Sequence, residues 1–161
     1  MGQTATMTET VSVSRTIDAP AELVWNLITD LPRMGEWSPE NNGGSWAKGA
    51  TGPSLGARFK GTNSNGRRRW STDVVITACE PGREFAFEVT ATGLAVANWS
   101  YRVEPEGDGC TVTETWTDTR GWIVKTLGGA ISGVSDRATF NQAGMEATLA
   151  NLATAAEAAD A

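Results

Sequence analysis

Apolar and polar residues alternate over residues 10–17, and this period of two predicts a β-strand. A helix is expected to start at Asp18, because a capping residue is followed by a proline in the first turn (Pro20) and an acid near the positive end of the helix dipole (Glu22). A second short helical turn comes next. After it we expect a loop rich in Gly and Asn, with a short strand near residues 43–48.

The sequence Asn65-Gly66 is the strongest short hairpin signal in the chain. A two-residue loop there pairs Phe59 with Thr72. Directly opposed residues lie on the same face of a sheet. One face of the predicted sheet therefore carries Phe59, Trp70, Thr72 and Val74.

A second two-residue loop, at Pro81-Gly82, pairs Ile76 with Phe87 and Ala78 with Phe85. This register places the apolar residues on the face that the first hairpin selects. A slip of one residue in either hairpin would move every side chain to the other face. The agreement between the two hairpins therefore indicates which side of the sheet is inside.

A third hairpin is expected to turn at Gly107-Asp108. This loop places Tyr101 opposite Glu114 and Trp99 opposite Trp116. All four side chains then lie on the apolar face, so the predicted interior contains one polar pair.

The last third of the chain predicts a long helix preceded by an apolar, Gly-interrupted segment. Residues 120–134 are either a short helix or a mobile lid, and Ser135 or Asp136 can cap a final helix that runs to about residue 158. Residues 1–9 are expected to be a disordered tail before a single domain, residues 10–158. The apolar stripe of the final helix contains Ala138, Asn141 or Gln142, Met145, Leu149, Leu152 and Ala156.

This order of elements predicts an α+β domain. We expect a curved antiparallel sheet of six or seven strands, with two short helices after the first strand and a long C-terminal helix against the concave face. A single helix cannot fill the hollow of such a sheet completely. An internal cavity is therefore expected.

Composition narrows the range of functions. The chain has 161 residues, a formal net charge of -6 and no His. The negative charge argues against a nucleic-acid binder and against docking on an anionic membrane. The lack of His excludes Ser–His and Cys–His mechanisms and removes the commonest zinc and iron ligand, so we expect no metal and no cofactor. Two Cys and no signal-peptide pattern favour a cytoplasmic protein.

Four segments and the final helix carry a resemblance to a known superfamily. The segments are Ile17 to Trp25, Asp30 to Pro32 with Trp37 to Pro39, Gly56 to Gly61, and Glu80 to Arg83. Together they resemble the START/Bet v 1-like (SRPBCC) superfamily and, within it, the bacterial polyketide cyclase/dehydrase-type proteins. The resemblance covers about residues 10–158. It implies a helix-grip fold with a deep hydrophobic cavity for lipids, sterols, polyketides or other small apolar ligands.

Function stays open at this point, because the superfamily includes carriers, sensors and enzymes. The first hypothesis is a carrier or sensor that binds a small hydrophobic ligand of lipid, polyketide or aromatic type. The alternative is a polyketide cyclase or dehydratase in which Glu114 and Tyr101 are the acid–base groups, since a carboxyl group on an apolar face has a raised pKa. In a third interpretation, Glu114 is held by Tyr101, Arg120 or a backbone donor and only shapes the cavity.

The expected partner is a small apolar ligand, with no nucleic acid and no integral membrane contact, and the protein is expected to be a monomer or homodimer. A weaker hypothesis is an accessory protein whose partner binds the Gly-rich residues 128–135. Arg68 has inward parity and could reach the cavity rim. The residues predicted to line the cavity are Phe59, Asn63, Trp70, Thr72, Val74, Phe87, Trp99, Trp116, Asn141 and Met145.

Overall fold

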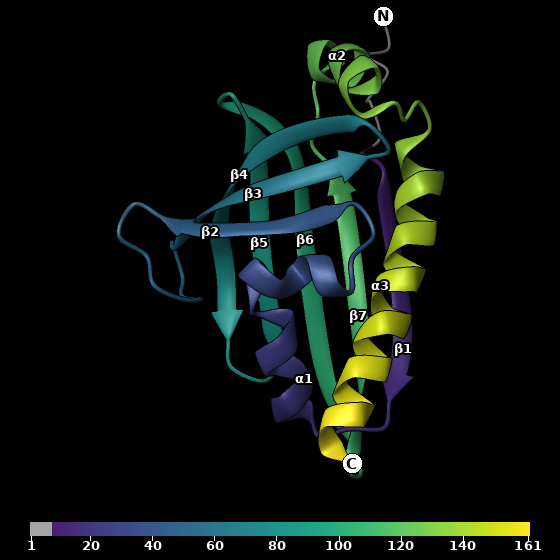
Figure 1. Ribbon diagram of the computed structural model, residues 1–161. Helices are drawn as coiled ribbons and strands as arrows, with labels where there is room; N and C mark the ends of the chain where they lie inside the picture. Colours follow the sequence, from purple (N-terminus) through teal and green to yellow (C-terminus); the bar gives the residue numbers. More distant parts are fainter. Residues whose placement is uncertain (1–7) are drawn as a thin grey trace, which may run out of the picture.

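Seven strands form one antiparallel sheet in the computed structural model, which describes residues 8–161 (Figure 1). The order across the sheet is β1-β7-β6-β5-β4-β3-β2, so the first two strands of the chain, β1 and β2, form its two edges. Most of the predicted disordered tail lies outside the described residues. The strands are β1 (Thr10–Ile17), β2 (Asn41–Ala47), β3 (Arg58–Asn65), β4 (Arg68–Glu80), β5 (Glu84–Ala91), β6 (Leu94–Glu106) and β7 (Gly109–Asp118).

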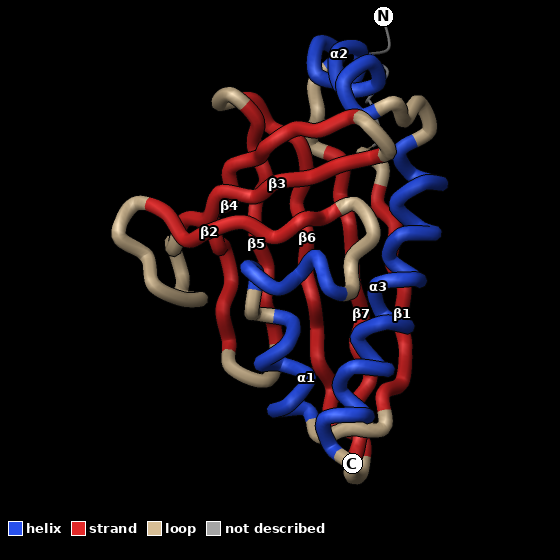
Figure 2. The backbone as a smooth tube through the Cα atoms, in the orientation of Figure 1, coloured by secondary structure: helices blue, strands red, loops and turns tan. Residues whose placement is uncertain are grey.

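The sheet is strongly curved, because β2 and β3 run across the view while β5, β6 and β7 run along it (Figure 2). The long helix α3 (Arg137–Asp160) packs on β1, β7 and α1 (Ala21–Ile28). A short 3-10 helix, η1 (Leu31–Glu36), lies against β2. This arrangement confirms the predicted α+β fold with a curved sheet, two short helices after the first strand and a long C-terminal helix.

Helix α3 begins where the sequence predicts. Asp136 is the capping residue, and its carboxylate accepts hydrogen bonds from the Thr139 backbone N–H at 3.2 Å and the Thr139 hydroxyl at 2.8 Å. Of the two candidates for the apolar stripe, Asn141 is buried and Gln142 is exposed. The other buried residues of the stripe are Met145, Leu149, Leu152 and Ala156.

The segment before α3 forms a helix, α2 (Trp122–Ser132), which is the first of its two interpretations. Gly133 ends it with a φ of 75°, a left-handed conformation in which glycine carries no steric penalty. In Figure 1, α2 lies at the end of the molecule opposite the C-terminus.

The predicted register of the first hairpin is wrong by two residues. Phe59 pairs with Val74 and not with Thr72, because the turn is formed by Gly66 and Arg67. Gly66 has a φ of 62°, and a positive φ at the first turn position is the type II′ arrangement that favours glycine. A shift of two residues preserves the face on which each side chain lies.

The second hairpin is right near its base and wrong near its turn. Ile76 pairs with Phe87 as predicted, but Ala78 pairs with Ala86 because a β-bulge follows Ile76. The loop consequently has three residues, Pro81 to Arg83. The third hairpin has the predicted register throughout, with Tyr101 opposite Glu114 and Trp99 opposite Trp116.

Buried apolar side chains form two clusters on the concave side of the sheet. The larger one lies between the sheet, α1, η1 and the C-terminal half of α3, and includes Ile76, Phe85, Val112 and Leu152. The smaller one contains Ala97, Trp116 and Met145. The core is therefore divided into two clusters along the length of α3. Both cysteines are free.

Candidate ligand-binding site

A carboxyl group and a phenol meet on the concave side of the sheet. Tyr101 of β6 and Glu114 of β7 are directly opposed, and the Tyr101 hydroxyl donates to Glu114 Oε1 at 2.8 Å. Only 2% of the Glu114 residue is exposed, and Tyr101 is also buried. Within residues 8–161, the other carboxyl oxygen, Oε2, has no hydrogen-bond partner.

Burial controls the protonation of this pair. Desolvation raises the pKa of Glu114 to about 8, and the hydrogen bond from Tyr101 opposes that rise. The pKa of Tyr101 is raised well above its usual value, first by burial and then by the neighbouring Glu114. At neutral pH Glu114 is therefore mainly a carboxylic acid, which has one O–H donor.

Glu114 lies at the junction of the two apolar clusters. Two residues before it on β7, Val112 belongs to the larger cluster, and two residues after it, Trp116 belongs to the smaller one. Side chains two residues apart on a strand share a face. The unpartnered oxygen therefore lies between two patches of apolar side chains.

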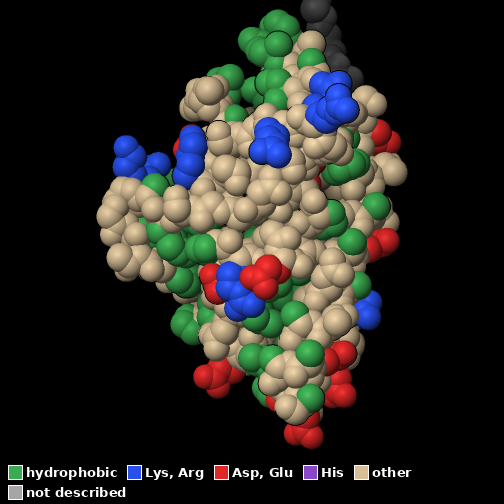
Figure 3. Space-filling view, viewed as in Figure 1, with side chains coloured by type: hydrophobic (Ala, Val, Ile, Leu, Met, Phe, Trp, Pro, Cys, Tyr) green, Lys and Arg blue, Asp and Glu red, His purple; other side chains and the backbone are tan. Residues whose placement is uncertain are grey.

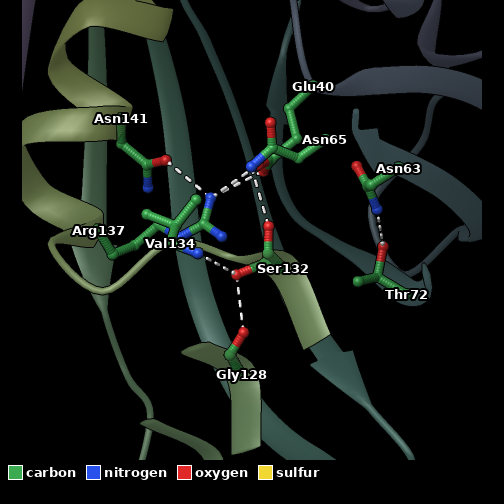
Figure 4. A network of polar contacts seen from close by, with 9 residues as sticks. All are labelled: Glu40, Asn63, Asn65, Thr72, Gly128, Ser132, Val134, Arg137 and Asn141. Atoms are coloured by element: carbon green, nitrogen blue, oxygen red, sulfur yellow. Dashed lines mark hydrogen bonds and ion pairs between the residues drawn. The ribbon is translucent and has the colours of Figure 1, made fainter. Parts of the chain in front are cut away.

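A polar network joins α3 and the α2–α3 connection to the edge of the sheet (Figure 4). Arg137 donates to the carboxylate of Glu40 at 2.8 and 3.0 Å and to Asn141 Oδ1 at 3.3 Å. Asn65, at the end of β3, donates to the backbone carbonyl of Ser132 at 2.9 Å. The N-terminal end of α3 is thus tied to a residue 97 positions earlier in the sequence, and the end of α2 to a residue 67 positions earlier.

Arg68 is exposed, and its predicted reach to the cavity rim remains a prediction. Its guanidinium donates to the backbone carbonyl of Ala130 in α2. Arg120 does not reach Glu114, because it forms a two-point ion pair with Asp118 at 2.9 Å. Of the predicted partners of Glu114, Tyr101 is the one that bonds to its side chain.

The structure divides the predicted lining residues into three groups. Phe59, Val74 and Phe87 are part of the larger apolar cluster, with Trp99 packed against it, and Trp116 and Met145 form most of the smaller one. Asn141 belongs to the Arg137 network, and Asn63 donates to the Thr72 hydroxyl at 3.4 Å. Trp70 is half-buried beside Asn63.

Two open grooves lie on other parts of the sheet. One, of about 550 Å³, is formed by β3 and β4 with Asn42 and includes Asn63, Arg69 and Trp70. The other, of about 280 Å³, lies over β5, β6 and β7 and includes Glu88 and Asn98. Helix α3 lines neither groove, so the expected cavity between sheet and helix remains a prediction.

The Arg137–Glu40 ion pair was not predicted from the sequence. One signal was available, since Arg137 is four residues before Asn141 and lies on the same face of the final helix. A charged residue on that face needs a partner. Glu40, which lies in a polar loop, gave no corresponding signal.

The sequence matches the model of the family described as "Polyketide cyclase / dehydrase and lipid transport" over residues 8–157. This chain belongs to that family. A solution structure of a polyketide-cyclase-like protein from Corynebacterium glutamicum is 30% identical, with a TM-score of 0.63. The match covers 92% of this chain and 91% of that one. No curated protein matches the sequence.

More distant structures share the fold alone. A ginseng major latex-like protein from Panax ginseng has a TM-score of 0.70 at 14% identity, over 92% of this chain and 97% of that one. The di-domain ARO/CYC of the steffimycin biosynthetic pathway has a TM-score of 0.71 at 13% identity. That match covers 93% of this chain and 51% of the other, so this chain spans about half of the di-domain protein. These likenesses confirm the helix-grip fold, whereas the family match and the 30% identical structure support the predicted START/Bet v 1-like superfamily.

Helices among residues 8–161 are too short or too polar to cross a membrane. Among the same residues, His, Cys, Asp and Glu side chains do not gather in threes at any point where they could hold a metal ion.

Proposed function

We propose that this protein binds a small hydrophobic ligand between the sheet and α3, as a carrier or sensor. The ligand has an apolar body and at least one hydrogen-bond-accepting oxygen, such as a carbonyl. The observation that carries the proposal is the buried, unpartnered Oε2 of Glu114. A buried polar atom without a partner costs about 1–3 kcal/mol, and a ligand oxygen would remove that cost.

The protonation state of Glu114 supports this ligand class. With a pKa of about 8, the carboxyl group is mainly neutral at pH 7 and donates through its O–H. Tyr101 already donates to Oε1, so the acidic proton resides on Oε2. The group is therefore complementary to an acceptor oxygen rather than to a cation.

The surroundings of Glu114 support an apolar ligand body. Trp116 and Met145 lie on one side of it along the sheet and α3, and the larger apolar cluster lies on the other. Aromatic side chains favour flat ligands through stacking. Family membership agrees with this reading, since its description covers both cyclases and lipid transport.

Binding of prodan, a fluorescent naphthyl ketone with one carbonyl oxygen, tests the proposal. We expect the wild type to bind it with a shift in emission. Glu114→Leu removes the donor and weakens binding about ten-fold. Glu114→Gln is the matched control, because its amide still donates and it keeps most of the affinity.

The pH dependence of prodan binding adds an independent readout. Affinity for the wild type falls as the pH rises through about 8, where Glu114 ionises, whereas the Gln variant shows no such fall. Equal affinity of all three proteins, unaffected by pH, would refute the proposed role of Glu114. Native mass spectrometry of protein purified from its own cells then identifies the natural ligand.

The alternative is a cyclase or dehydratase with Glu114 and Tyr101 as acid–base groups. The observation in its favour is the same pair, because a carboxyl group with a pKa near neutrality can both release and accept a proton. A poly-β-ketone thioester is a suitable substrate, since its enolisation requires a proton to move. If the Glu114→Gln variant binds the poly-β-ketone thioester but no longer turns it over, the enzyme hypothesis is supported. If the wild type itself binds without turnover, the carrier hypothesis is supported.

A further inference from the structure

Helix α2 presents its apolar side chains to solvent. Trp122 is 78% exposed, and Ile123, Leu127 and Ile131 are each about half exposed. The last three follow one another at intervals of four residues, so they form a stripe along one face of the helix. A helix of a folded domain ordinarily turns such a stripe towards the core. An exposed apolar patch of this kind marks a surface for another partner.

Positive charge surrounds the exposed stripe. Arg67, Arg68 and Arg69 are exposed at the β3–β4 turn, and Arg68 holds that turn against α2 through the Ala130 carbonyl. Lys125 lies on α2 itself, and residues 122–132 contain no acid. Figure 3 shows Lys and Arg beside the apolar upper end of the molecule, whereas Asp and Glu gather at the lower end.

The acids near α2 are few, and one of them, the exposed Glu9, lies beside Asp118, because its backbone carbonyl accepts from the Asp118 N–H at 2.9 Å. Asp118 is buried and forms ion pairs with Arg120 at 2.9 Å and Lys125 at 4.0 Å. Asp136 is exposed and caps α3. Although the net charge of the whole chain is -6, the charge around α2 is thus positive. The net charge of the whole chain argues against binding to an anionic membrane. A partner contacts only a local surface, however, and the surface around α2 is positive.

We propose that α2 and the β3–β4 turn dock this protein on the surface of an anionic lipid bilayer. Trp122, Ile123, Leu127 and Ile131 enter the boundary between headgroups and acyl chains, as in interfacial amphipathic helices. Arg67 and Arg69 contact the anionic headgroups.

The charges disfavour a second copy of the chain as the occupant. In a two-fold contact across α2, the arginines of one copy would face those of the other, and like charges repel. A short helix at the tip of a domain also covers little of the roughly 800 Å² per partner that a stable interface needs. A convex apolar tip with a basic rim suits a bilayer, which needs no matching groove.

Docking through α2 would place the polar network at the start of α3 close to the lipid. The network that ties α3 to the sheet, Arg137 with Glu40 and Asn65 with Ser132, lies at the same end of the molecule as α2. Ser132 is the last residue of α2 and Gly133 follows it. A displacement of α2 at a membrane would therefore act directly on these contacts.

Flotation with unilamellar vesicles tests the proposal. We compare vesicles of phosphatidylcholine with vesicles in which about one third is phosphatidylglycerol, at low and near-physiological ionic strength. We expect the full chain to bind the anionic vesicles, to bind phosphatidylcholine far less, and to lose affinity as salt rises.

Three variants separate the contributions. Trp122→Ala with Leu127→Ala lowers binding at least ten-fold. Arg67→Gln with Arg69→Gln lowers it roughly five-fold per arginine and leaves Arg68 in place. Leu55→Ala is the matched control, because Leu55 is 74% exposed on a loop away from α2, and we expect no change.

Several results would overturn the inference. Absence of wild-type binding to anionic vesicles at low salt is one. Equal binding by the Trp122/Leu127 variant and the Leu55 control is another. Self-association of the lipid-free protein that the Trp122/Leu127 substitutions abolish, measured by sedimentation velocity, would assign this face to a second copy instead.

Discussion

Among residues 8–161, Glu114 is the buried group whose ionisation changes most between pH 5 and pH 8, and replacing it with Gln removes that change. Glu114 has a pKa of about 8 in the folded protein, against 4.5 for an ordinary glutamate. A group with a higher pKa in the folded state binds its proton more tightly there. Its contribution to stability is therefore full below about pH 4.5 and is lost as the pH rises through about 8.

The magnitude follows from the difference between the two pKa values. Each pH unit between them lowers the free energy of unfolding by about 1.4 kcal/mol, because the folded state holds a proton that the unfolded state has released. From about pH 5 to pH 8 the wild type loses roughly 3 to 4 kcal/mol relative to the Gln variant. For a domain of this size the loss corresponds to about 10 °C in Tm.

Urea unfolding of both proteins at several pH values, followed by Trp fluorescence, measures this difference. Gln keeps the shape of the side chain and still accepts the hydrogen bond from Tyr101. The pKa values of Cys79 and Cys110 are raised by burial, but both thiols are present in both proteins and cancel in the comparison. As the pH rises, the free energy of unfolding of the wild type should fall relative to that of the Gln variant.

A constant difference between the two curves would refute the reasoning. It would mean that Glu114 ionises at an ordinary pH in the folded protein, and hence that water or another group reaches Oε2. The same result would remove the basis for a neutral donor in the proposed ligand site.

Three other substitutions have defined expected outcomes. Tyr101→Phe removes the hydrogen bond that lowers the pKa of Glu114, so the fall in stability with pH should shift to higher pH in the same urea titration. Arg137→Gln breaks the ion pair with the half-buried Glu40 and should cost roughly 1–2 kcal/mol, with a Glu40→Gln second substitution recovering part of it in a double-mutant cycle. Trp116→Ala leaves a cavity in the smaller cluster and should cost about 3–5 kcal/mol of unfolding free energy by denaturant titration.

The sequence predicted the side of the sheet that faces inward more reliably than it predicted individual pairs. The first hairpin illustrates the difference, because the turn moved by one residue and Phe59 faces Val74. The side chain of Asn65 explains part of this shift, since it bonds to Ser132 and is not in the turn. That contact lies 67 residues away in the sequence, and no local pattern reports it.

The Tyr101–Glu114 pair was predictable because it depends on one short loop. The turn signal at Gly107-Asp108 set the register of β6 and β7, and the register placed the two side chains opposite each other. The missing partner of Oε2 was not predictable, because it depends on every element packed around Glu114. The exposed stripe of α2 was unpredictable for the same reason, since an apolar stripe indicates a buried face until the packing is known.

The order of the elements, the inward face of the strands and the start of α3 at Ser135 or Asp136 could all be predicted from the sequence alone. These features depend on residues within a few positions of one another, where alternation, turn residues and capping groups act. The tertiary structure decided how the core divides around Glu114, which partner Arg137 finds and which way α2 faces. Those outcomes depend on burial and on contacts between residues far apart in the chain, and burial is what raises the pKa of Glu114.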